Sequence, residues 1–111
     1  MIIDLEKLQT YTVQNMNGGR GSIDAQMFID AGGKIMKSVI KKGCSIGEHI
    51  HITSSEINFV LSGNGKATCN GENEPLHPGV CHYCPKGSAH SMENTGEEDL
   101  VLYTVVSEKE N

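Results

Sequence analysis

The stretch from Gly43 to Gly63, GCSIGEHIHITSSEINFVLSG, constrains the fold and chemistry of this chain more than any other. His49 and His51 are separated by one residue, so on an extended strand both imidazoles point to the same face. Glu56 follows a run of turn-forming residues, which places it at the start of the next strand. Two imidazoles and a carboxylate directed at one point are typical of a transition-metal site, and a fourth ligand is expected downstream.

The range 79–94, GVCHYCPKGSAHSMEN, contains the candidate for that fourth ligand. His90 lies three residues after Gly87 and five after Pro85, and these two residues predict a bend that returns His90 toward the first stretch. Taken singly, a histidine or glutamate of this kind is more often a surface or hydrogen-bonded side chain than a ligand. The joint spacing of all four residues favours a metal shell.

Together the two stretches read G-x5-H-x-H-x4-E-x6-G and G-x5-P-x-G-x2-H-x3-N. The fixed positions are Gly43, His49, His51, Glu56, Gly63, Gly79, Pro85, Gly87, His90 and Asn94. In these positions the chain resembles the cupin superfamily, and because only fifteen residues separate the motifs it resembles the small single-domain cupins. The resemblance implies an all-β fold, a single double-stranded β-helix (jelly-roll) barrel. It also implies one divalent metal held by His49, His51, Glu56 and His90.

The turn pattern of the chain agrees with many short strands, because thirteen glycines punctuate segments rich in valine, isoleucine and threonine. We expect nine or ten strands, with a loop from Pro75 to Gly79. Residues 1–37 are expected to add N-terminal strands to the barrel, 38–106 to form the cupin core, and 107–111 to be a charged tail. Small cupins commonly dimerise through an N-terminal strand, so the resemblance implies a homodimer with residues 1–37 at the interface.

Charge and hydropathy exclude several classes of partner. The net charge is −5 and no basic cluster is present, which disfavours nucleic acid and anionic membranes. No apolar run reaches the length of a membrane span. The first ten residues, MIIDLEKLQT, carry acids where a secretory signal needs a basic region, so a cytoplasmic location is expected.

Cys81 and Cys84 form a C-x2-C pair, which is open to a redox or zinc interpretation. We expect the pair on a strand, where odd spacing sends the two thiols to opposite faces. No second C-x2-C completes a zinc ribbon. Reduced thiols are therefore the preferred interpretation.

Alternation from the ligands nominates further pocket residues. Asn58 is expected to share the face of Glu56, and Met92 that of His90. Asn58 would orient a ligand or a metal-bound water, or would simply be a polar residue at a strand end. His82 and Tyr103 are candidate proton carriers on nearby strands, with packing or surface exposure as the alternative for each.

Three nitrogen ligands and one oxygen ligand without thiolate suit Mn, Fe, Co, Ni or Zn. Cupins that act on oxalate or phosphosugars need cationic groups for their anionic substrates, and Arg20 is the only arginine of this chain. The leading hypothesis is a small-molecule enzyme of cupin type, a dioxygenase, isomerase or lyase. The alternative is a non-catalytic, metal-containing module that binds or senses a small molecule.

Overall fold

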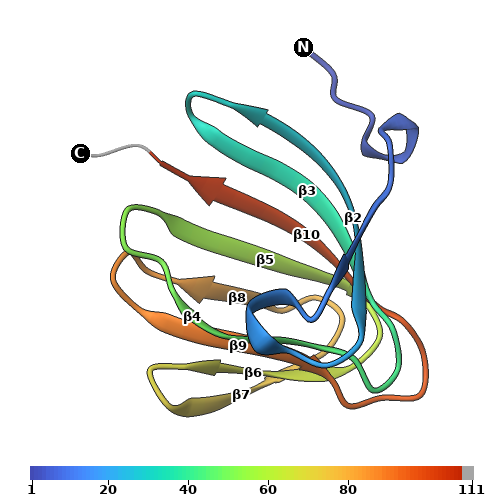
Figure 1. The fold of residues 1–111 in the computed structure, drawn as a ribbon, viewed down its shortest axis with the longest axis vertical. Coiled ribbons are helices and arrows are strands. Elements are labelled where there is room, and N and C mark those ends of the chain that lie inside the picture. The colour runs from blue at the N-terminus through green and yellow to red at the C-terminus, as the bar shows by residue number, and fades with distance from the viewer. Residues whose placement is uncertain (109–111) are drawn as a thin grey trace.

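The computed structural model describes residues 1–108 and contains ten strands in two antiparallel sheets (Figure 1). One sheet has six strands in the order β1-β2-β3-β10-β5-β8, and the other has four in the order β4-β9-β6-β7. The strands are β1 Tyr11–Gln14, β2 Ser22–Asp30, β3 Gly33–Ile40, β4 Ser45–Ile50, β5 Ser55–Ser62, β6 Gly65–Cys69, β7 Glu72–Leu76, β8 Cys81–Cys84, β9 Ala89–Asn94 and β10 Leu100–Ser107. The two sheets confirm the expected jelly-roll barrel.

The core lies between the sheets and follows the alternation of strand side chains. On β10 the odd positions face outward, whereas Leu100, Leu102 and Val106 are buried. The same alternation on the other strands completes one apolar cluster, in which Leu100 and Leu102 pack with Ile23, Ile40, Ile46, Val60, Ala67, Leu76 and Met92. The hydrophobic residues of both sheets therefore close the barrel from the inside.

Two short 3-10 helices, Leu5–Lys7 and Met16–Gly18, lie in the N-terminal part of the chain. The second belongs to a glycine-rich turn that packs against β4. This approach requires glycine at position 47, because a Cβ there would lie 2.1 Å from the carbonyl oxygen of Asn17. The contact places Met16 beside the ligand-bearing strand.

The hairpin of β6 and β7 differs from the sequence-based expectation. The range 75–79 was expected to be a loop, but β7 runs to Leu76 and pairs with β6. Pro75 lacks the N–H that a central strand needs. The strand tolerates it because β7 lies at the edge of its sheet.

The C-terminal end of the described chain continues the last strand. Ser107 belongs to β10, and the backbone N–H of Glu108 donates to the carbonyl of Gly32. The rest of the expected charged tail, 109–111, lies outside the described residues. Within residues 1–108, no helix is long and apolar enough to cross a membrane.

Candidate metal centre

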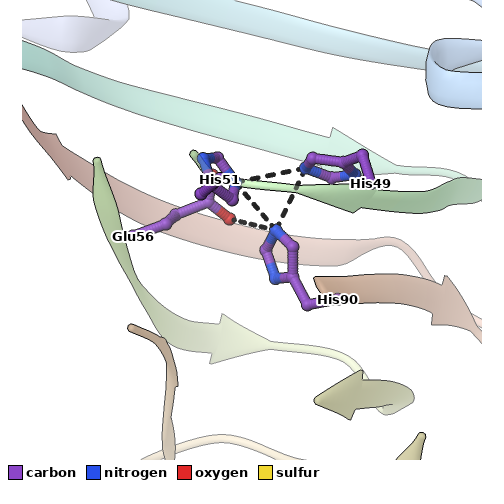
Figure 2. A group of neighbouring side chains, drawn as sticks. All are labelled: His49, His51, Glu56 and His90. Carbon is purple, nitrogen blue, oxygen red and sulfur yellow. Dashed lines mark hydrogen bonds and ion pairs between the residues drawn. The ribbon is translucent and has the colours of Figure 1, made fainter. Parts of the chain in front are cut away.

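The four predicted ligands come from both sheets and meet inside the barrel (Figure 2). His49 lies on β4 and His51 directly after it, while His90 lies on the neighbouring strand β9. His49 and His90 are cross-strand partners, so the sheet itself brings these two rings together. Glu56 reaches the same point from β5 of the other sheet.

The distances between the ligand atoms fit one shared cation. The Nε2 atoms of His49, His51 and His90 form a triangle with sides of 3.2, 3.0 and 3.1 Å. The Glu56 oxygens lie 3.2 Å from Nε2 of His51 and 3.3 Å from Nε2 of His90. Two donors bound to one ion at about 2.1 Å are separated by about 3.0–3.4 Å.

The hydrogen bonds behind the rings leave the centre rich in lone pairs. Nδ1 of His49 donates to the carbonyl of Gly47 at 2.8 Å, so Nε2 of the neutral ring carries no proton. Nδ1 of His51 is 3.2 Å from the hydroxyl of Ser54, which can donate or accept. The cluster therefore gathers acceptors with few protons between them, and a divalent cation satisfies such a cluster.

Glu56 is held by a second set of buried polar groups. Asn58, which is fully buried, donates from Nδ2 to Glu56 Oε2 at 2.9 Å. The hydroxyl of Thr104 in turn donates to Asn58 Oδ1 at 2.7 Å. Asn58 thus orients the carboxylate, and it is also one of the residues that line the cavity beside the centre.

That cavity has a volume of about 60 Å³ and an apolar wall. Five of its lining residues are polar: His49, Glu56, Asn58, Ser38 and Thr104. Four methionines line it, here called the methionine wall: Met16, Met27, Met36 and Met92. Sequence reasoning nominated Met92 alone, because the other three lie on distant N-terminal segments that only the fold brings to β9.

His82 and Tyr103 do not line this cavity. Tyr103 lies between Leu102 and Thr104, which face inward, so its own side chain is on the outer face of the six-stranded sheet. There the residue is 40% exposed. This corrects its nomination as a pocket residue. His82 is only 2% exposed and lies behind His90, with Nε2 3.0 Å from Nδ1 of His90.

Arg20 and the cysteine pair also lie apart from the cavity. Arg20 forms an ion pair with Glu93 and donates to the carbonyl of Gly43, so it does not fold over the metal ligands. Cys81 is exposed and Cys84 is buried, on opposite faces of β8. Burial raises the pKa of Cys84 to about 11, which keeps this thiol protonated at neutral pH.

Burial also determines the charge of the histidine cluster in the metal-free protein. Desolvation, with the neighbouring histidines His49, His51 and His82, lowers the pKa of His90 to about 3. Desolvation also lowers the pKa of His51, although the negative charge of Glu56 raises it in part. These rings are therefore neutral ligands at physiological pH.

The metal-free protein is expected to lose stability as the pH falls below about 6.5. The unfolded chain protonates His90 near pH 6.5, whereas the folded protein does so only at about pH 3. The contribution of neutral His90 to the free energy of unfolding is therefore fully present above pH 6.5. About 2–3 kcal/mol of this contribution is lost between pH 6.5 and 4.5. Urea unfolding in EDTA across this range measures it.

The matched variants are His90→Gln, expected to flatten this dependence, and His77→Gln, expected to preserve it because His77 is exposed on a loop. Equal slopes for His90→Gln and the wild type would contradict the prediction. The range stops at about pH 4.5 because Glu93 contributes below it. The hydrogen bond from Arg20 lowers the pKa of Glu93. The stability that ionised Glu93 contributes is therefore lost as the pH falls below the ordinary pKa of a glutamate.

Sequence comparison gives two results for this chain. A family model described as Cupin domain matches residues 36–106. The chain is also 28% identical over 112 residues to the oxalate-binding protein of Thermotoga maritima, with 96% of this chain and 93% of that protein covered.

Solved structures agree with the sequence comparison. A crystal structure described as a predicted oxalate decarboxylase from Thermotoga maritima superposes with a TM-score of 0.91 at 26% identity, covering 98% of this chain and 100% of that one. A Cupin 2 conserved barrel domain protein from Salinispora arenicola has a TM-score of 0.69 at 27% identity, with 96% and 86% covered. Because the family model spans more than half of the chain, and the two-sheet barrel with its histidine and glutamate cluster agrees with it, this chain belongs to the cupin family.

Proposed function

We propose that this chain is a metal-dependent cupin enzyme that acts on a small organic molecule. The observation that supports the proposal is that His49 and Glu56, two of the four candidate ligands, line the same cavity as the methionine wall. A molecule in the cavity therefore has its polar end at the metal centre and its apolar body against methionine. A divalent Mn, Fe, Co, Ni or Zn ion held by His49, His51, Glu56 and His90 would supply Lewis-acid chemistry, and Mn or Fe also redox chemistry.

The cavity limits the size and polarity of the substrate. A volume of about 60 Å³ accommodates about four to six non-hydrogen atoms, by comparison with the space that one water occupies. Methionine is apolar, polarizable and flexible, so the wall adapts to the shape of a small apolar group and excludes water around it. These properties favour a small molecule with one oxygen-rich end.

The residues that border the cavity favour chemistry centred on the metal ligands. Among the described residues that line it, only His49 and Glu56 are titratable. An isomerase or lyase that needs a separate general base in the cavity receives less support than a dioxygenase, in which the side chains mainly position the substrate. Glu56 is the best-placed group for any proton transfer, because Asn58 fixes its carboxylate.

A non-catalytic binding module is the second candidate. The shortage of titratable groups in the cavity favours it, and the relative from Thermotoga maritima is named an oxalate-binding protein. Oxalate itself would meet an apolar wall without lysine or arginine in the described cavity lining. A second, more open hollow borders His49, His51 and Glu56, and Lys34 is the one lysine or arginine among the described residues that line it.

Metal binding is expected to depend on the four candidate ligands and not on His77. The chain has five histidines, and His77 lies on an exposed loop. Protein purified without added metal should contain about one divalent transition metal per chain, measured by elemental analysis. His49→Ala, His51→Ala and His90→Ala should each lower the affinity by at least about tenfold, whereas His77→Ala should not. Equal metal content in all four variants would contradict the metal site.

Pyruvate and oxalate are matched probes of the cavity, because they have equal numbers of non-hydrogen atoms and differ only in a methyl group that replaces one carboxylate oxygen. The reference is the ratio of the affinities of the same free metal ion for pyruvate and for oxalate in water. The metal-loaded protein is expected to shift this ratio toward pyruvate, because the methyl group fits the methionine wall. Extension to 2-oxobutanoate gives seven non-hydrogen atoms, more than the cavity accommodates, and should not raise the affinity further. Calorimetric titration measures all three ligands.

A preference for oxalate as strong as in water, or stronger, would contradict the proposed apolar substrate and would support an oxalate-binding role. Each ligand is also incubated with the loaded protein while dioxygen uptake and new products are followed. Tight binding without chemical change across such a panel favours the binding module over the enzyme.

We also propose that the protein is a homodimer with residues 1–37 at its interface. Among the described strands β1 pairs with β2 alone, so within residues 1–108 its other edge is available to a second copy. Tyr11 and Ile29 are large exposed apolar side chains on these two strands. Light scattering should give a dimer for the wild type and a monomer for Ile29→Lys, while Ile52→Lys, an equal change at an exposed loop position, should remain dimeric. A monomeric wild type would contradict the proposal.

A further inference from the structure

Behind His90, a pair of side chains that does not touch the cavity forms a hydrogen-bonded chain to the protein surface. Nδ1 of His82 lies 2.7 Å from Glu74 Oε1, and Nε2 of His82 lies 3.0 Å from Nδ1 of His90. The rings of His82 and His90 are nearly parallel, at 15°. Glu74 lies on β7 at the edge of one sheet, and His82 on β8 at the edge of the other.

The direction of these hydrogen bonds follows from the chemistry of the groups. An ionised carboxylate only accepts, so Nδ1 of His82 donates to Glu74. In the neutral ring Nε2 of His82 then carries a lone pair, and it accepts from Nδ1 of His90. Nε2 of His90 is left without a proton, and it is the atom that faces the other candidate ligands.

We propose that Glu74 and His82 are positioning residues for the metal centre, which hold His90 in the tautomer and orientation that bind metal. This inference rests on the metal site of the proposed function. Each of the other two histidines has a different partner at Nδ1, the backbone carbonyl of Gly47 for His49 and the hydroxyl of Ser54 for His51. Of the three rings, His90 is the one whose Nδ1 is held by a chain of two side chains. His82 accepts a hydrogen bond from His90, and Glu74 accepts one from His82. Partners of this kind behind a ligating histidine raise its basicity and fix its ring.

A purely structural role for His82 is the alternative, since the same hydrogen bonds connect the edge strands β7 and β8. The two roles differ in what they predict for metal affinity at equal stability. His82→Phe keeps a ring but removes the acceptor, and His82→Gln keeps an oxygen that accepts from His90. Glu74→Gln removes the charge and keeps an acceptor for His82, and Glu72→Gln makes the same charge change two residues away on the same face of β7.

The affinity of the metal-free protein for Zn²⁺ or Co²⁺, measured by competition with a chelator, decides between the roles. His82→Phe is expected to lower it by about 10- to 100-fold, and His82→Gln to restore it to within about threefold. Glu74→Gln is expected to lower the metal affinity about three- to tenfold, because a neutral amide oxygen accepts a weaker hydrogen bond. Glu72→Gln is expected to leave the affinity unchanged. The Co²⁺ absorption spectrum should change in His82→Phe and match the wild type in His82→Gln.

A second measurement needs no substitution. The ring ¹⁵N shifts of the metal-free wild type are expected to report His90 protonated at Nδ1 and bare at Nε2. The opposite tautomer, or unchanged Zn²⁺ affinity in both His82→Phe and Glu74→Gln, overturns the inference. Should His82→Phe fail to fold, Glu74→Gln and the tautomer decide alone. A wild type that binds no metal instead refutes the proposed function, and the tautomer result shows separately whether the hydrogen-bonded chain exists.

Discussion

The convergence of lone pairs at one point between the sheets is the constraint on which the remaining features of this cupin depend. Three imidazole nitrogens and a carboxylate lie within 4.8 Å of one another, inside a barrel that keeps most water away. Without a cation, neighbouring acceptors repel, and burial strengthens that repulsion. The structure keeps them together because each group is fixed from behind: by a backbone carbonyl, a hydroxyl, an asparagine or another histidine.

Strand register explains how one sheet provides both the support of the centre and half of the methionine wall. A single cross-strand row on the inner face of the six-stranded sheet runs through Met27, Met36, Thr104, Asn58 and His82. Its first two members are thioethers and its last three are hydrogen-bonding groups. The row therefore changes from apolar to polar across five strands. Because side chains alternate, a slip of one residue in β10 would place Tyr103 in the row and remove Thr104 from it.

The sequence predicted the convergence of the four candidate ligands well and their surroundings less well, for physical reasons. His49, His51, Glu56 and His90 were identified because short-range spacing on strands fixes which face a side chain takes. Tyr103 was nominated from its place on a nearby strand and not from alternation, and the structure shows the alternative of surface exposure. Glu74 was missed because Pro75 favoured a loop, and only the edge position of β7 makes a proline tolerable there.

The methionine wall could not be predicted, because it joins segments that are distant in sequence. Met16 and Met27 lie before the range 36–106 that the family model matches, whereas all four candidate ligands lie within it. On the proposed function, the surface that selects a guest molecule is thus partly encoded outside the segment that contains the candidate ligands. Substitutions of Met16 and Met27 would then change which molecule is accepted while leaving all four candidate ligands in place.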